Sequence, residues 1–94
     1  MKITLTKSIT AHGEPITEIE LREPTGREVQ DIGFPYLVLM NDDTEAIQIQ
    51  AKAVGKYVSK LAGIPPSSVD QMSAADLSAC TGVVMSFFGV QAAV

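Results

Sequence analysis

The sequence is short of the side chains on which most protein chemistry depends. It has no tryptophan, one histidine, His12, and one cysteine, Cys80. A single cysteine excludes an intramolecular disulfide, and a reducing compartment is expected. Metal sites need several ligands, and nucleophilic catalysis needs a thiol or hydroxyl beside a base. We therefore predict a protein that is not an enzyme and that uses no cofactor and no metal.

The side chains that could carry chemistry have simpler interpretations. His12 precedes Gly13 in a predicted turn, which is typical of an exposed loop histidine. Cys80 falls on the apolar stripe of a predicted helix, with no basic residue nearby in sequence to lower its pKa, so a buried and inert thiol is expected. Asp42 and Asp43 precede a predicted helix, where capping and the helix dipole account for them.

Charged residues are also scarce, and basic ones are confined to the first two thirds of the chain. They make up 19% of the sequence, the net charge is −4, and no Lys or Arg follows Lys60. Residues 54–77 resemble a helix-turn-helix in outline, but the second helix would carry Asp70 and Asp76 and no basic residue. Because DNA affinity comes largely from neutralising phosphates, we predict no nucleic-acid partner. An anionic membrane surface would likewise need a basic face.

The last part of the chain, residues 77–94, contains no charge at all. A helix of that length would span about 27 Å, close to the hydrocarbon thickness of a membrane. However, serine, threonine, glycine and glutamine dilute the segment, and no basic residue flanks it as an anchor. We expect a helix that is buried in the protein or against a partner protein, and no membrane association.

The chain of 94 residues is expected to form one small domain, 1–94. Apolar and polar residues alternate around Ile3, Leu5 and Ile9 and again over 16–21, with a turn sequence between the two runs. These runs predict a β-hairpin over about 2–22, and a helical part over about 25–94 follows it. The expected fold class is α+β, with an N-terminal β-hairpin followed by about three α-helices.

Capping signals place the expected helices. Thr25 and Glu28 match a capping box, and Gly33 with Pro35 ends that helix. The run 36–40 is too short to classify: it fits a third strand or the lead-in to the next helix. A helix of about four to five turns is expected next, with its N-terminus at the capping-box spacing of Asp42 and Glu45. Its apolar stripe comprises Ile47, Val54, Val58 and Leu61. Gly63, followed by Pro65 and Pro66, is expected to end this helix.

A last helix begins at Ser73 and has more apolar residues than one face can hold. Leu77, Cys80 and Val84 form the stripe that is expected to face the core. Val83 lies about 100° from Val84, and Phe87 and Phe88 straddle the edge of the stripe. Exposed apolar patches often mark interaction sites. We therefore predict that Val83, Phe87 and Phe88 bind a protein partner, with burial of all three inside the fold as the alternative.

The same shortage of polar surface predicts self-association. A hairpin has two open edges, and few charged residues are available to cover the surface of the domain. We expect a homo-oligomer, formed by edge pairing or by helix packing.

Two stretches of the sequence resemble the tail assembly chaperones of contractile-tailed bacteriophages and related prophages. The first is LREPTGREV, residues 21–29, after an LTKSI opening at 5–9. The second is YVSKLAGIPPSSVDQM, residues 57–72, followed by Ala75-Asp76-Leu77 and by Phe87-Phe88. The order of these blocks and the chain length also fit the family, whereas residues 34–50 match no firm family pattern.

The resemblance implies a non-enzymatic assembly factor that binds the tail tape-measure protein and keeps it soluble during tail morphogenesis. It further implies a protein of the bacterial host cytoplasm that leaves before the tail is finished and is absent from the mature virion. The alternative is a structural or adaptor subunit that is retained in the phage tail. No binding residue is carried over from the family.

Overall fold

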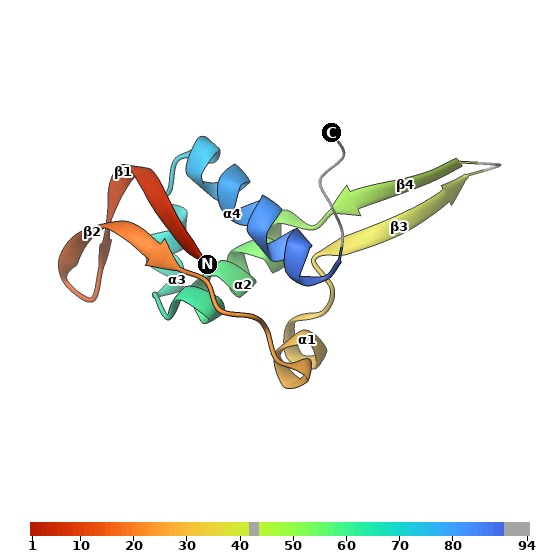
Figure 1. Ribbon diagram of the computed structural model, residues 1–94, viewed down its shortest axis with the longest axis horizontal. Helices are drawn as coiled ribbons and strands as arrows, with labels where there is room; N and C mark the ends of the chain where they lie inside the picture. The colour runs from red at the N-terminus through yellow and green to blue at the C-terminus, as the bar shows by residue number, and fades with distance from the viewer. Residues whose placement is uncertain (42–43, 90–94) are drawn as a thin grey trace.

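The computed structural model describes residues 1–41 and 44–89. Two β-hairpins and four α-helices follow one another along these parts of the chain, which places the fold in the α+β class (Figure 1). The elements are β1 Lys2–Ala11, β2 Glu14–Glu20, α1 Gly26–Ile32, β3 Tyr36–Asn41, β4 Thr44–Ile49, α2 Ala51–Ala62, α3 Pro66–Asp70 and α4 Ala74–Phe87.

The first hairpin confirms the N-terminal prediction. β1 and β2 pair antiparallel, and Ile3 and Ile19 are paired across the ladder and buried. The register shifts between Thr4 and Ile9. Within this irregular stretch, the backbone amide of Thr6 donates to both carboxylate oxygens of Asp76, at 2.9 and 3.0 Å. The N-terminal turn of α4 therefore supplies the hydrogen bonds that the strand pairing leaves out.

The helix boundaries follow the local signals in the sequence. Thr25 and Glu28 form both halves of a capping box on α1, and Ser73 caps α4 through the amide of Asp76. Gly63 ends α2 with a φ of 68°, a left-handed conformation that glycine adopts without a steric penalty. These three termini are where the sequence predicts them.

The second hairpin corrects the prediction for the middle of the chain. We expected a helix to begin near Asp42 and to carry Ile47 on its stripe, but Ile47 lies in β4 and α2 begins only at Ala51. The run 36–40, left open above, is a strand. Asp42 and Asp43 lie outside the described residues. The prediction was wrong because Ile47 precedes Val54 by seven residues, which is two helical turns. The strand residue therefore has the spacing of the apolar stripe of α2.

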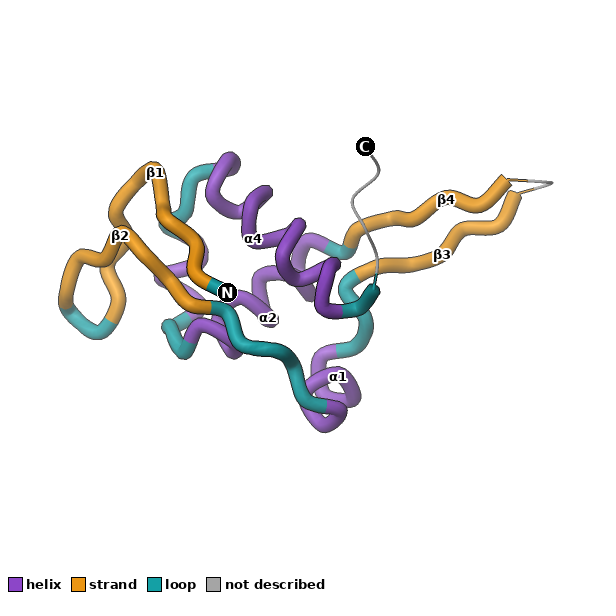
Figure 2. The backbone as a smooth tube through the Cα atoms, viewed as in Figure 1, coloured by secondary structure: helices purple, strands orange, loops and turns teal. Residues whose placement is uncertain are grey.

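The hydrophobic core lies between the first hairpin and the helices. Its largest fully buried side chains include Ile9 and Leu21 from the hairpin region, Tyr57 and Val58 from α2, and Val84 from α4. Among the described side chains, none from β3 or β4 belongs to this core. The molecule measures 49 × 28 × 20 Å, and the β3–β4 hairpin projects from one end of its long axis (Figures 1 and 2).

Candidate functional site

Four aromatic rings meet where the projecting hairpin joins the body of the protein. The Phe88 ring lies 5.9 Å from Phe34, 6.4 Å from Tyr36 and 5.4 Å from Tyr57, measured between ring centroids. The interplanar angles of these three contacts are 68°, 75° and 72°, so the rings pack edge to face. The cluster joins the end of α4 to α2 and to the segment that leads into β3.

Hydrogen bonds fix the base of the hairpin beneath this cluster. The Tyr57 hydroxyl donates to the carbonyl of Gly33 at 2.6 Å, and the amide of Gln50 donates to the carbonyl of Pro35 at 2.8 Å. Tyr57 is fully buried, and this burial, together with the charge of Glu28, raises the pKa of its phenol. The hydroxyl therefore keeps its proton and its role as donor. The Tyr57 bond ties the segment before β3 to α2, and the Gln50 bond ties the two ends of the hairpin to each other.

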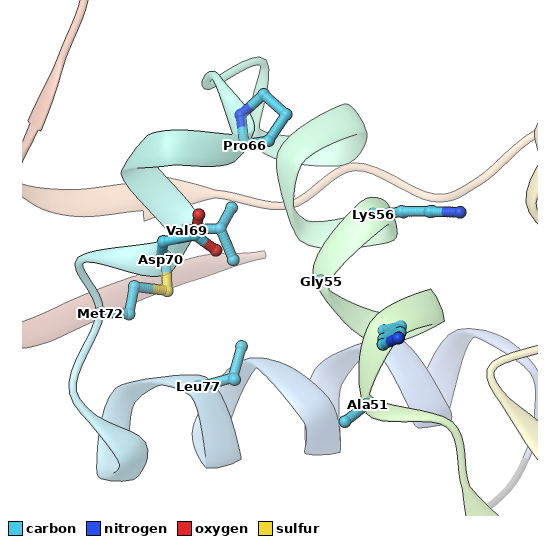
Figure 3. Close-up of a pocket in the computed structure, with 9 residues that line it drawn as sticks. Ala51, Gly55, Lys56, Pro66, Val69, Asp70, Met72 and Leu77 are labelled. Carbon is cyan, nitrogen blue, oxygen red and sulfur yellow. The ribbon is translucent and has the colours of Figure 1, made fainter.

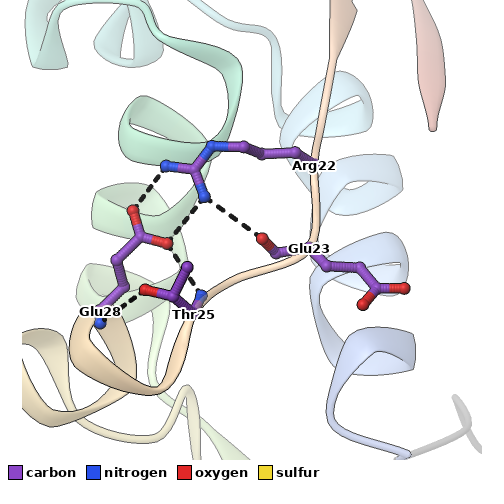
Figure 4. Close-up of polar contacts among 4 residues, drawn as sticks. All are labelled: Arg22, Glu23, Thr25 and Glu28. Carbon is purple, nitrogen blue, oxygen red and sulfur yellow. Dashed lines mark hydrogen bonds and ion pairs between the residues drawn. The ribbon is translucent and has the colours of Figure 1, made fainter.

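An ion pair holds the segment between the first hairpin and α1 (Figure 4). The Arg22 guanidinium donates to both carboxylate oxygens of Glu28, at 2.8 and 2.6 Å, and the Thr25 amide donates to the same carboxylate at 3.0 Å. The hydrogen bonds from Arg22 and then from Thr25 lower the pKa of Glu28 to about 2. This carboxylate fixes the first turn of α1, the helix that leads to Phe34.

The apolar surface continues from the aromatic cluster along one face of the hairpin. Tyr36 pairs with Ile49 and Val38 pairs with Ile47, and directly paired residues of antiparallel strands share a face. Val38, Ile47 and Ile49 are 52%, 50% and 49% exposed, and Phe34 beside them is 60% exposed. We name this region the hairpin–aromatic surface: Phe34, Tyr36, Val38, Ile47, Ile49 and Phe88.

The opposite face of the hairpin is less uniformly apolar. Leu37, 51% exposed, is paired there with the polar Gln48. The hairpin–aromatic surface contains no charged residue. A two-stranded hairpin with an uncovered apolar face is only marginally stable in water, so a covering partner would stabilise it.

The three partner-binding residues predicted at the end of α4 share a half-buried position, and one of them has a further contact. Val83, Phe87 and Phe88 are half-buried and pack against the core. Of the three, Phe88 also joins the aromatic cluster and thereby the hairpin–aromatic surface. Of the stripe predicted to face the core, Cys80 and Val84 are fully buried, whereas Leu77 is half-buried and packs against the core.

The sequence reasoning missed most of the hairpin–aromatic surface. Phe34, Ile47 and Ile49 were not singled out as exposed residues, and Tyr36 and Val38 appeared only within an unclassified apolar run. The available signal was the alternation over 44–49, where Ile47 and Ile49 take every second position. Two β-branched residues at that spacing favour a strand.

The two reactive side chains occupy the predicted environments. His12 is exposed at the turn of the first hairpin, with a φ of 54°, and its Nε2 lies 3.0 Å from the Gly63 carbonyl. Cys80 is fully buried, and burial, aided by the Asp76 charge, raises the pKa of its thiol to about 11. Within the described residues, no group of three or more potential ligands could hold a metal ion. The helices traced there are also too short or too polar to cross a membrane.

An exposed, uncharged apolar surface such as this one is typical of a protein that works by binding another protein. A comparison with protein families identifies the class to which this chain belongs. Residues 2–89 match the family of phage tail assembly chaperone proteins described as E, or 41 or 14, and the chain belongs to this family. No curated protein and no solved structure matches the chain.

Proposed function

We propose that this tail assembly chaperone binds the tail tape-measure protein through the hairpin–aromatic surface and keeps it soluble until the tail is built. The observation that carries the proposal is the exposed, uncharged face of Val38, Ile47 and Ile49, continuous with Phe34 and Phe88. A tape-measure protein is a long, largely helical and apolar chain. An apolar sheet face can cover one side of such a helix and exclude water from both.

The proposal extends to the end of α4, with Val83, Phe87 and Phe88 as anchors. Aromatic anchors in the centre of an interface can contribute more than about 2 kcal/mol each. Phe88 supports this role because it contacts Phe34 and Tyr36 of the hairpin–aromatic surface. Val83 and Phe87 would extend the contact along the helix.

Co-expression with the tape-measure protein tests this function. We expect that wild-type chaperone raises the soluble fraction of the tape-measure protein and co-purifies with it, and that Phe88→Ser abolishes both effects. Phe87→Ser should weaken them. If the folded Phe88 variant still solubilises the tape-measure protein, the end of α4 is not part of the contact.

Folding of these variants must be measured in parallel, because losing a core phenylalanine costs about 3–5 kcal/mol. Circular dichroism and thermal melting of the same variants separate a lost contact from a lost fold. If both variants unfold, the two phenylalanine rings are part of the core that stabilises the fold. Substitutions on the hairpin then have to test the partner contact.

We also propose that the chaperone acts in the host cytoplasm and leaves before the virion is complete. Mass spectrometry of purified virions should find the tape-measure protein and no copy of this chain. A stoichiometric amount of the chain in mature particles would instead identify a structural subunit of the tail.

The proposed role requires no chemistry from the side chains. We expect the double variant His12→Ala, Cys80→Ser to support tail assembly as well as the wild type, since His12 lies in an exposed turn and Cys80 is a buried thiol. Plaque counts in a complementation assay provide the measurement. Loss of assembly by a variant that folds and still binds the tape-measure protein would indicate an enzymatic step.

A further inference from the structure

A second open feature lies away from the hairpin, between three helices. A groove of about 530 Å³ is bounded by α2, α3 and α4. Val69 from α3 and Leu77 from α4 point toward Gly55 on α2, so the walls are apolar (Figure 3). Lys52 and Lys56 lie on the α2 rim, and Asp70 lies on the α3 side.

Helix α2 departs from ordinary helix preferences on the wall of this groove. Lys52 lies in the first helical turn, where the helix dipole disfavours positive charge, and the turn contains no acidic residue. Lys52 and Lys56 are spaced four residues apart, so their like charges repel. Gly55 stands in the helix interior, where alanine is the more stable residue. Local conflicts of this kind are expected where a site serves function.

The two lysines are also available to a partner. Both are exposed, and within the described residues neither has an acidic oxygen within ion-pair distance; the ion pairs found there are Lys2–Glu18, Arg22–Glu28 and Arg27–Asp31. In a chain of net charge −4, this places an isolated basic edge beside an apolar groove. The complementary ligand is apolar with a negatively charged flank.

We propose that this groove binds an amphipathic α-helix of a protein partner whose apolar stripe is flanked by acidic residues four apart. Acidic residues at that spacing match the spacing of Lys52 and Lys56 on α2, and an apolar stripe fills the space over Gly55. Added to Gly55, a Cβ atom would meet only a Val69 methyl carbon, at 3.9 Å, so the missing side chain leaves room for a ligand. The proposal shares with the proposed function only the premise of a protein partner.

A synthetic helix tests the groove without the tape-measure protein. The probe is a fluorescein-labelled peptide of about 18 residues, with leucines at helical spacing and glutamates beside them; a second peptide carries lysines in place of the glutamates. Fluorescence anisotropy with the full chain measures both affinities. The net charge of the protein favours the lysine peptide, whereas the groove favours the glutamate peptide, so the preference discriminates between them.

We expect the wild-type chain to bind the glutamate peptide about tenfold more tightly than the lysine peptide, with a preference that disappears at 1 M salt. Lys52→Glu, Lys56→Glu together should reverse the preference. Lys56→Glu alone should weaken the preference, and Lys60→Glu is its matched control, because it makes the same single charge reversal on the same helix outside the groove lining. Gly55→Leu should fill the groove and weaken binding of either peptide more than about tenfold.

Equal affinities for the two peptides overturn the proposal, and so does an equal effect of Lys60→Glu. Unchanged binding by folded Gly55→Leu also overturns it, as does a change in oligomeric state of that variant, which would assign the groove to a second copy of the chain. If circular dichroism shows that Gly55→Leu is unfolded, the proposal is judged from the peptide preferences of the Lys52, Lys56 and Lys60 variants. None of these results bears on tape-measure solubility, so the two proposals fail separately.

Discussion

At the residue scale, a few polar contacts fix the segments that carry the apolar surface. Glu28 accepts hydrogen bonds from Arg22 and Thr25 at the start of α1. Asp76 accepts hydrogen bonds from Thr6 and Lys7 at the irregular part of β1, and these lower the pKa of its carboxyl, the Thr6 amide most of all. Both carboxylates join segments that hydrophobic burial alone would leave free to shift.

The lowered pKa values predict acid sensitivity. The pKa of Glu28 falls from an ordinary 4.5 to about 2 on folding, so its contribution to stability is complete above pH 4.5 and is lost as the pH falls toward 2. We expect the melting temperature to decrease over this range, and Glu28→Gln to melt lower at pH 6 with a shallower decrease below it. Asp76 accounts for part of the remaining slope.

The control for this measurement is Glu23→Gln. Glu23 is exposed, and its side chain makes no ion pair within the described residues. Thermal melting between pH 6 and pH 2.5 should give the same profile for this variant and the wild type. A Glu28→Gln profile that is parallel to the wild type would show that the ion pair seen in Figure 4 does not stabilise the fold.

At the element scale, local signals in the sequence predicted the first hairpin, the starts of α1 and α4 and the end of α2. The capping box of Thr25 and Glu28 and the left-handed Gly63 depend on neighbouring residues, so they can be recognised without the tertiary structure. The second hairpin could not be separated from α2 in this way. Its apolar residues fit the period of a helix as well as that of a strand. Because neither face of the hairpin packs into the core, its sequence also lacks the alternation of apolar and polar residues that marks a half-buried strand.

The candidate site was predictable only in part, for a related reason. Phe88 was singled out because the last helix carries more apolar side chains than one face can hold. Phe34 and Ile49 join it only through the return of the chain at the hairpin base, where Gln50 bonds to Pro35. That long-range arrangement leaves no pattern in the sequence.

Gly55 provides a test of the helix argument for α2. Gly55→Ala should stabilise the protein by about 1 kcal/mol, because alanine is the better helix former and a Cβ atom fits there with an ordinary contact to Val69. For a domain of this size, that corresponds to a rise of about 4–8 °C in melting temperature. Differential scanning calorimetry measures it. A fall in melting temperature would mean that the groove wall is more tightly packed than its geometry indicates.

At the scale of the whole molecule, apolar surface is exposed at one end of an elongated structure (Figure 1). The β3–β4 hairpin leaves Val38 and Ile47 about half exposed on one face and Leu37 on the other. Hydrophobic area of this kind is expected to associate with any complementary apolar surface, including a second copy of the chain. The tape-measure protein and self-association would then compete for the same residues.

We therefore expect the isolated chain to self-associate. Sedimentation equilibrium should show dimers or larger species below about 100 µM, which corresponds to an association free energy of about 5.5 kcal/mol. The association should persist at high salt, since the surface is uncharged. A monomer throughout this concentration range would contradict the expectation.

The most direct test of the central claim is a pair of neighbouring substitutions on β3, Val38→Asp and Leu37→Asp. The two side chains are 52% and 51% exposed, but they lie on opposite faces of the hairpin. Pull-down of co-expressed tape-measure protein measures the effect. If the hairpin–aromatic surface is the contact, Val38→Asp buries an unpaired charge and weakens binding more than about 100-fold, whereas Leu37→Asp stays within about threefold of wild type. Equal loss from both variants, or binding retained by folded Val38→Asp, would contradict the account.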